Sequence, residues 1–469
     1  MKSAKKHPLV TGTVILTLTG LLSRVIGFFY RIYLSRLFGE EGMGLYQLLS
    51  PVLSLSFALT AAGYQTAISK LVAEQSALRK TPSLRPLWAG MRISLPLSLL
   101  CNAFVYLFAD FIASSLLQEP RTAPMLRILS FSIPLSAVHA CVNGYFYGVK
   151  RAGIPAVSQL LEQLTRVGCV YLLSARALAS GSAPSINAAV LGLTVGEFFS
   201  MLYSAAVIPR RSKEKRFTAS RFSPLPTVSP KRQPVISKPN SEKEPPVSSD
   251  LYRGLLAMAL PLTANRIVLN LLQSVESVSI PSMLRLYGYD NTTALSVYGV
   301  LTGMAMPFIF FPNALTSSVA VLLLPVISEN YALGNFASVR QATVKTVKYC
   351  GFLGICCMAG FVGLGSWAGN TLFHSPLAGY FISTLGFICP FLYLDTTLSS
   401  ILQGLGKAGH IFVLNVLCLL LRLGFVFLAV PRFGITGYLW GLLASQLTLG
   451  VLYLTCLGRL LKKMPPPAT

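Results

Sequence analysis

The chain has 469 residues, of which 53% are hydrophobic and only 12% are charged, and its formal net charge is +24. A soluble protein contains about twice this share of charged residues. Apolar runs recur along the chain at about the 20 residues that a helix needs to cross a bilayer, without the alternation of a transmembrane barrel. The sequence therefore predicts an all-α polytopic membrane protein and excludes a soluble enzyme or binding domain.

The positive charge lies mostly in short loops between the apolar runs and in one longer polar segment. Basic residues on the predicted cytoplasmic side outnumber those on the other side about four to one, as the positive-inside rule requires. The charge thus indicates membrane orientation, and we expect no nucleic acid partner. Both termini are predicted to be cytoplasmic.

The first apolar run, residues 9–37, follows three lysines and resembles the start of a signal peptide. Arg24 and Arg31 interrupt it and no small-residue cleavage site follows, so we predict an uncleaved first helix. The other helices of the first half are predicted at residues 45–69, 88–109, 125–148, 154–177 and 187–208. Those of the second half are predicted at residues 254–281, 295–324, 349–369, 377–404, 411–430 and 435–457.

A segment of different composition, residues 209–250, separates the two halves. It is rich in Pro, Ser, Lys and Arg and has few large apolar residues, which predicts a cytoplasmic linker without a packed core. Its RRSKEKR run has two interpretations, binding to anionic lipid heads or a solvated loop that fixes the topology. We therefore predict an N-lobe at residues 1–208 and a C-lobe at residues 251–469.

A repeated pattern supports this division. Residues 134–166, which contain GYFYGVKRAG, match residues 390–422, which contain ILQGLGKAG, after a shift of 256 positions. Two copies of six helices enter the membrane in the same orientation. The sequence thus predicts about 12 transmembrane helices in two six-helix parallel-repeat lobes, with a substrate site between them.

Cations deep in two corresponding helices suggest what that site binds. Arg24 and Arg31 lie seven residues apart, on one face of the first helix, and Arg266 lies within the seventh. A charge at the bilayer centre costs about 2.5–3.5 kcal/mol, so it normally faces a cavity or a partner. We predict that these arginines bind an anionic diphosphate in a central cavity; structural pairing is the alternative.

Further ionisable groups interrupt the apolar helices and are secondary cavity or coupling candidates. Glu162 and Arg166 lie one turn apart, so they either line the cavity or neutralise each other as a structural pair. Arg422 corresponds to Arg166 but has no acid one turn away, and it needs a partner from another helix or a ligand. The remaining candidates are His139, Glu197, Glu276 and Asp395.

Three long segments resemble a known family. They are residues 21–74, residues 144–167 (GYFYGVKRAGIPAVSQLLEQLTRV) and residues 296–329 (SVYGVLTGMAMPFIFFPNALTSSVAVLLLPVISE). They resemble the stage V sporulation protein B group, in the polysaccharide transporter branch of the multidrug/oligosaccharidyl-lipid/polysaccharide flippase superfamily. The resemblance implies the fold of multidrug and toxin extrusion transporters and the movement of lipid-linked sugar precursors.

The same resemblance guides the choice of site residues. Arg24 and Arg31 resemble arginines in the first helix of the related lipid II flippases, with a spacing offset by one residue. Those flippases also have an arginine early in the eighth helix, which the segment beginning at Tyr298 lacks. We infer that Arg266 takes its place.

Two functions follow from these observations. The first is a flippase that moves an undecaprenyl-diphosphate-linked peptidoglycan or polysaccharide unit across the bacterial cytoplasmic membrane by alternating access, in spore cortex or cell-wall synthesis. The second is a cation-coupled multidrug antiporter, which would use Glu197, Glu276 and Asp395. A cationic cavity attracts diphosphate and repels cationic drugs, so we favour the flippase.

The expected partners are membrane lipids and the lipid-linked saccharide, with cell-wall synthesis proteins as candidates. The chain shows no metal-ligand cluster, nucleotide loop or activated nucleophile, so we expect no enzyme activity, metal or cofactor. A proton gradient and a sodium gradient are both candidate energy sources.

The charge distribution makes the topology testable. Single cysteines near Lys5, Ser237 and Pro465, in a cysteine-free background, should resist a membrane-impermeant thiol reagent on intact cells because all three sites are predicted to be cytoplasmic. A cysteine near Arg432, in a predicted outer loop, is the matched control and should react. Labelling of any of the first three from outside would contradict the predicted orientation.

Overall fold

The computed structural model describes residues 8–79, 83–208 and 249–463, so most of the predicted linker lies outside the described residues. The described residues form helices and short π- or 3₁₀-helical turns, with no β-strand among them. The first half consists of α1 (Pro8–Leu48), α2 (Ser50–Phe57), η1 (Ala58–Ala62), α3 (Gly63–Arg79), α4 (Arg85–Leu107), α5 (Ala109–Phe111), η2 (Ile112–Leu116), η3 (Pro120–Thr122), α6 (Ala123–Ser130), α7 (Ser132–Gly148), α8 (Gly153–Ala179) and α9 (Asn187–Val207).

The second half repeats this plan. It consists of α11 (Ser249–Tyr287), α12 (Asn291–Gly299), η4 (Val300–Ala305), α13 (Met306–Phe310), α14 (Asn313–Ala332), α15 (Phe336–Ala368), η5 (Gly369–Phe373), α16 (Pro376–Leu385), η6 (Gly386–Ile388), α17 (Cys389–Gly404), α18 (Ala408–Leu428), α19 (Val430–Phe433) and α20 (Ile435–Lys463).

Ten helices of the described residues are long and apolar enough to cross a membrane, or up to eleven if one bent pair is a single span. The number differs from the twelve predicted spans for three reasons. Residues 18–76 count as one although the backbone is not helical at Gly39, between the first and second predicted helices, and the eighth is divided into Asn291–Phe310 and Asn313–Ala332. The fifth predicted helix, residues 154–177, is present as α8, but Glu162 and Arg166 lower its apolarity.

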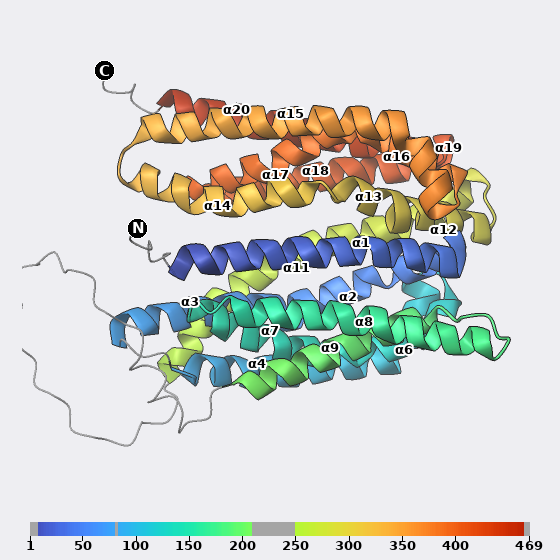
Figure 1. The fold of residues 1–469 in the computed structure, drawn as a ribbon, viewed down its shortest axis with the longest axis horizontal. Coiled ribbons are helices and arrows are strands. Elements are labelled where there is room, and N and C mark those ends of the chain that lie inside the picture. The colour runs from blue at the N-terminus through green and yellow to red at the C-terminus, as the bar shows by residue number, and fades with distance from the viewer. Residues whose placement is uncertain (1–7, 80–82, 209–248, 464–469) are drawn as a thin grey trace, which may run out of the picture.

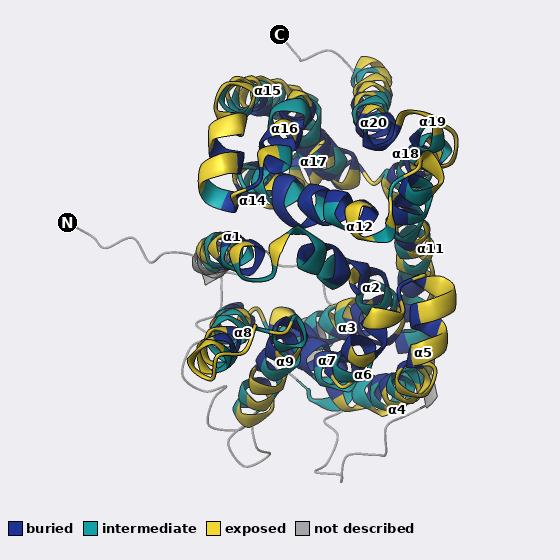
Figure 2. Cartoon of the chain, turned by 90° about the vertical axis from the view of Figure 1, so that its right-hand side faces the viewer, coloured by how far each residue is buried: buried dark blue, intermediate teal, exposed yellow. Residues whose placement is uncertain are grey.

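The two halves lie on opposite sides of the molecule, with α1 and α11 between them (Figures 1 and 2). The helix α1 contacts α8 of its own half and α12 and α14 of the other. In the same way α11 contacts α18 and α19 of its own half and α2 and α3 of the other. The first helix of each half therefore joins the two lobes.

The internal repeat is visible in the breaks of the helices. The helices α6 and α7 are bent by 42° relative to each other, and Pro134 lies just after this bend. In the second half, the 3₁₀ turn η6 precedes Pro390, the matching proline, at the start of α17. Proline has no backbone N–H to donate and its ring clashes with the preceding helical turn, which places both breaks at the same position of the repeat.

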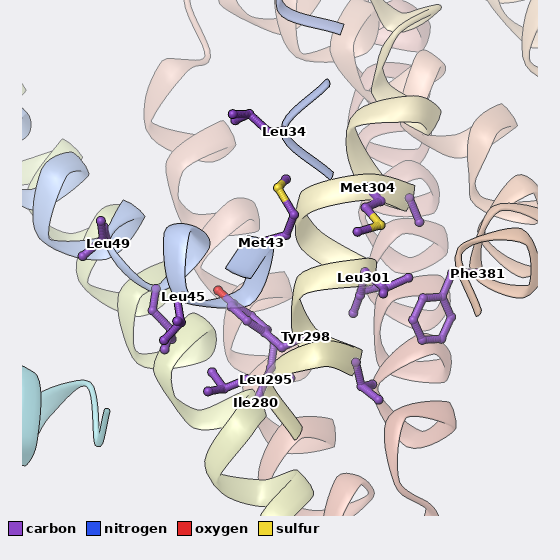
Figure 3. Close-up of a cluster of buried hydrophobic side chains, with 14 of the residues drawn as sticks. Leu34, Met43, Leu45, Leu49, Ile280, Leu295, Tyr298, Leu301, Met304 and Phe381 are labelled. Carbon is purple, nitrogen blue, oxygen red and sulfur yellow. The ribbon is translucent and has the colours of Figure 1, made fainter. Parts of the chain in front are cut away.

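A large apolar core joins the lobes at the end opposite the two termini, called the distal end below (Figures 1 and 3). Leu34 and Met43 of α1 are buried there with Leu295 and Tyr298 of α12. Many large apolar side chains elsewhere are exposed, such as Leu107 at 73% and Phe352 at 70%. An apolar surface of this extent suits contact with lipid.

Two glycines bring the backbones of the two lobes into close contact. A Cβ atom at Gly44 would lie 2.2 Å from the carbonyl oxygen of Leu295, and one at Gly299 would lie 2.2 Å from that of Glu40. No side chain fits at such distances, so the backbones of α1 and α12 can meet only because both positions are glycine.

Two arginines at matching positions link the lobes at the distal end. Arg36 of α1 donates to the carbonyl oxygens of Thr371 and Leu372 in η5, both at 2.8 Å. Arg285 of α11 donates to Gln118, which follows η2, at 2.5 Å. Each arginine therefore bonds to the π-helical region of the opposite lobe.

A carboxylate strengthens this distal contact. Glu119 accepts hydrogen bonds from Arg121 at 2.6 Å and from Asn291 of the second half at 2.7 Å. Burial alone would raise the pKa of Glu119, but the hydrogen bonds from Arg121 and Asn291 outweigh it and hold this pKa below its ordinary value. Because the folded-state pKa is lowered, the stabilisation is present at neutral pH and is lost as the pH falls through that pKa.

The glycine contact leads to a stability prediction. Gly299→Ala should lower the stability of the purified protein by about 1–3 kcal/mol, because the new Cβ overpacks the crossing of α1 and α12. Gly168→Ala in α8 is the matched control, since no atom lies within 4 Å of a Cβ there. Thermal unfolding in detergent measures both, and equal unfolding temperatures would contradict the close contact.

Candidate functional site

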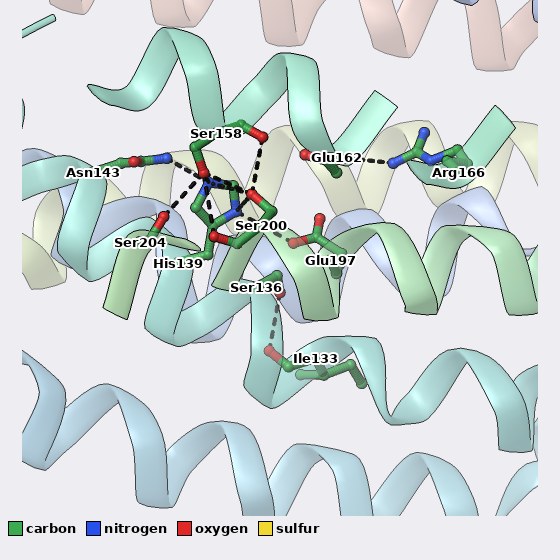
Figure 4. A network of polar contacts seen from close by, with 10 residues as sticks. All are labelled: Ile133, Ser136, His139, Asn143, Ser158, Glu162, Arg166, Glu197, Ser200 and Ser204. Atoms are coloured by element: carbon green, nitrogen blue, oxygen red, sulfur yellow. Dashed lines mark hydrogen bonds and ion pairs between the residues drawn. The ribbon is translucent and has the colours of Figure 1, made fainter. Parts of the chain in front are cut away.

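A polar cluster lies within the first half, between α7, α8 and α9 (Figure 4). The imidazole of His139 is buried, and its Nδ1 lies 3.3 Å from Oε2 of Glu197. The helices α8 and α9 pack closely at Gly196, where an added Cβ would lie only 2.8 Å from the carbonyl oxygen of Glu162. This packing brings the carboxylates of Glu162 and Glu197 to the same place.

Glu162 and Arg166 form the pair that their spacing predicted. The Arg166 guanidinium donates to Glu162 one turn away in α8, and both side chains are mostly buried. The structural-pair alternative is therefore present in the structure. Glu162 is also a neighbour of His139 and Glu197, so this pair belongs to a larger cluster.

Three serine hydroxyls and an amide extend the cluster. The Ser158 hydroxyl lies 3.0 Å from Nε2 of His139, 2.7 Å from the Ser200 hydroxyl and 2.9 Å from the Ser204 hydroxyl. The Asn143 amide nitrogen lies 2.7 Å from the same Nε2. The result is a buried hydrogen-bonded chain that runs from Ser204 to the carboxylate of Glu197.

In the second half, Arg422 of α18 has the interhelical partner that it requires. Its guanidinium lies 2.5–2.6 Å from the carboxylate of Glu276 in α11, and the Tyr438 hydroxyl of α20 donates to the same carboxylate at 2.7 Å. The matching arginines of the repeat are thus both neutralised, Arg166 within its own helix and Arg422 across a helix contact.

Asp395 of α17 is a buried carboxylate of a different kind. Its side chain is 6% exposed, and neither oxygen has a hydrogen-bond partner in the part of the chain that the structure describes. One oxygen faces Gly450 of α20, where a Cβ would lie 3.2 Å away. Asp395 thus takes no part in the hydrogen bonds of the Glu276 pair. In the repeat it occupies the position that corresponds to His139.

The three predicted diphosphate ligands lie in different surroundings. Arg31 is half-buried in α1 and interacts electrostatically with Tyr30, Tyr46 and Arg166. Arg24 of α1 and Arg266 of α11 are exposed. None of the three forms an ion pair with another described residue, and their convergence on one cavity stays a prediction.

Metal binding is a further possibility that the geometry raises. The ligand atoms of His139, Glu162 and Glu197 lie within 4.8 Å of one another. However, the Arg166 guanidinium occupies Glu162, and an amide and two hydroxyls surround Nε2 of His139. These donors take the positions that a cation would need, so the cluster as arranged suits hydrogen bonds.

Sequence reasoning found the charged residues of the cluster but missed its neutral ones. A signal was present, because His139 and Asn143 are four residues apart, as are Ser158 and Glu162, and Ser200 and Ser204. Each pair therefore lies on one helix face. The three faces could be assigned to one cluster only after α7, α8 and α9 were placed together.

Solved structures identify the class of this arrangement. The inward-closed conformation of lipid II flippase MurJ has a TM-score of 0.68 at 15% identity, over 95% of this chain and 87% of the other. An inward-facing multidrug resistance MATE family transporter of the MOP superfamily has a TM-score of 0.68 at 17% identity, over 95% and 96%. The protein is therefore a multi-pass membrane protein with the two-lobe fold of this transporter superfamily.

Sequence comparison gives the family. The chain belongs to the polysaccharide biosynthesis protein family, whose pattern matches residues 9–331. Stage V sporulation protein B of Bacillus subtilis (strain 168) is 27% identical, over 97% of this chain and 85% of the relative. The resemblance found in the sequence is confirmed.

The interhelical pair in the second half gives a direct test of its energetics. Glu276→Gln should destabilise the protein by about 3–5 kcal/mol, because it leaves the Arg422 guanidinium without a counter-charge in an apolar environment. The double variant Glu276→Gln with Arg422→Gln should recover much of this loss, since no uncompensated charge remains. Thermal unfolding of the two single variants and the double variant measures the coupling, and purely additive effects would contradict it.

Proposed function

We propose that the protein is a flippase for an anionic lipid-linked saccharide, moved across the cytoplasmic membrane by alternating access of the two lobes. The carrier would be undecaprenyl diphosphate and the saccharide a peptidoglycan or polysaccharide unit. The expected partners are thus membrane lipids and this lipid-linked saccharide. The similar proteins support this choice, since one is a lipid II flippase and another a stage V sporulation protein.

The observation that carries the proposal is the missing counter-charge of Arg31. This side chain is half-buried in α1 and forms no hydrogen bond or ion pair within the described ranges. Its charged neighbour Arg166 is already bonded to Glu162. A guanidinium binds phosphate oxygens with two parallel hydrogen bonds, so a diphosphate supplies the negative charge that this place lacks.

Arg24 and Arg266 fit the same proposal. Both are cations within long apolar helices, α1 and α11, and these helices lie between the lobes (Figure 2). Their exposure leaves both guanidinium groups free to contact a ligand. We propose that they bind the diphosphate together with Arg31 when the substrate enters between the lobes.

A cation-coupled antiporter is the second candidate. The buried, unpartnered carboxylate of Asp395 favours it, because such a group can take up a cation or a proton. The arginines of α1 argue against a cationic substrate, since like charges repel. The two candidates therefore differ in the sign of the charge that the cavity accepts.

Substitution of Arg31 tests the proposed function. Arg31→Ala should weaken binding of an undecaprenyl-diphosphate-linked sugar by at least about tenfold, because one charge-assisted hydrogen bond contributes about 1.5–3 kcal/mol. Arg31→Lys should restore part of the affinity, since it keeps the charge but loses the two-pronged geometry. Binding to the full-length protein in nanodiscs, followed by transport in proteoliposomes, gives both values.

The control is Arg176→Ala, which removes an exposed arginine at the end of α8 and should leave binding unchanged. A cationic dye serves as the competing ligand. Normal binding of the diphosphate lipid by both Arg24→Ala and Arg31→Ala would reject the flippase proposal. Tight dye binding that Asp395→Asn abolishes would support the antiporter instead.

A further inference from the structure

The two ring nitrogens of His139 have different surroundings. Nδ1 faces the Glu197 carboxylate at 3.3 Å, and Nε2 faces the Asn143 amide nitrogen at 2.7 Å (Figure 4). With the amide nitrogen toward Nε2, this ring nitrogen can only accept, so a neutral imidazole has its hydrogen on Nδ1 and donates to Glu197.

Asn143 can also serve the charged form of this ring. Its amide oxygen Oδ1 is buried and has no hydrogen-bond partner among the described residues. A half-turn of the amide exchanges Nδ2 and Oδ1, and the oxygen then faces Nε2. A protonated imidazole donates from both nitrogens, and Asn143 and Glu197 would accept both hydrogen bonds.

The charges around His139 favour the uptake of one proton. Glu162 and Arg166 of α8 neutralise each other, which leaves Glu197 of α9 with one negative charge. An imidazolium would balance that charge within the apolar helices, where an uncompensated charge is costly.

Other helices packed against α7 carry charged side chains too. Arg85 is the first residue of α4, and the following ones have contacts away from His139. Lys70 and Glu74 of α3 form an exposed pair, Arg92 of α4 bonds to Tyr252, and Arg127 of α6 bonds to Asp110. The charged groups whose atoms lie close to the imidazole are the carboxylates of Glu162 and Glu197, and Arg166 is bonded to the first of them.

A chain of buried hydroxyls also leads to the imidazole. The hydroxyls of Ser204, Ser158 and Ser200 form a continuous chain to His139. A hydroxyl both donates and accepts, so a chain of them can reverse its direction as a proton passes. Ser204 lies in the last turn of α9, whose last residue is Val207, and the chain therefore leads toward the end of the lobe where the predicted linker begins.

We infer that His139, Asn143 and Glu197 form a proton-binding site that is filled through the hydroxyls of Ser158, Ser200 and Ser204. The site takes up one proton per molecule, and the Asn143 amide turns when it does so. This inference concerns how the lobe changes its charge and holds for any substrate that the protein moves.

The test is a titration of the full-length protein in nanodiscs by NMR, with labelled histidine rings. The chain has four histidines, and His139→Gln identifies the signal of His139. The wild-type signal should show uptake of one proton between about pH 5 and pH 8. Glu197→Gln should weaken proton binding by at least about tenfold, because an adjacent opposite charge shifts a pKa by about 1–3.

Two further variants make the outcome decisive. Asn143→Leu should also weaken proton binding, because the charged ring then loses an acceptor, and it serves if Glu197→Gln does not fold. Glu329→Gln, an exposed carboxylate of α14 in the other half, is the matched control and should change nothing.

Three results would overturn the inference. They are a His139 signal that stays neutral throughout this range, a titration that neither variant shifts, and displacement of the proton by sodium ions added in place of potassium. The titration uses no saccharide, so failure of the flippase proposal would leave its result unaffected.

Discussion

A charge inside an apolar helix must be balanced, and this constraint explains most of the polar contacts within the lobes. Arg166 is bonded to Glu162, and Arg422 is bonded to Glu276. In both lobes the arginine occupies the same position of the repeat, but its carboxylate comes from a different place. The arginine is therefore kept in both copies of the repeat. Its charge is neutralised by a carboxylate one turn away in the same helix in one lobe, and by a carboxylate of α11 in the other.

The groups that escape this balance are the ones to which we assign function. Arg31 has no counter-ion among the described residues, and Asp395 has no hydrogen-bond donor there. Leaving such groups uncompensated costs a few kcal/mol each, and a bound anion, cation or proton removes that cost. The two lobes consequently differ in chemistry, with a hydrogen-bonded imidazole in one and a bare carboxylate at the matching position of the other.

Local patterns in the sequence predicted the elements and the repeat, because hydrophobic length and helix breakers act within one segment. Gly39 and Gly288 illustrate this: each lies three residues after an arginine, Arg36 or Arg285, and both adopt the positive φ angles that favour glycine. The pair of Glu162 and Arg166 could be predicted for the same reason, since it lies within one helix. The association of Arg422 with Glu276 could not, because the residues are 146 positions apart and only the packing of α18 on α11 brings them together.

The distal contacts between the lobes combine exposed hydrogen bonds with a buried core. Arg36 and Arg285 bond mainly to backbone carbonyl and side-chain amide oxygens, at exposed positions where each hydrogen bond contributes about 0.5–1.5 kcal/mol, or somewhat more for a charged donor. The crossing of α1 and α12 adds close backbone contact at two glycines, and apolar side chains such as Leu34, Met43 and Leu295 are buried beside it. Separation of the distal end exposes these side chains at about 1.5–3 kcal/mol each, so the core costs more to open than the arginine contacts. Alternating access therefore requires a ligand that binds the separated state more tightly by at least this amount.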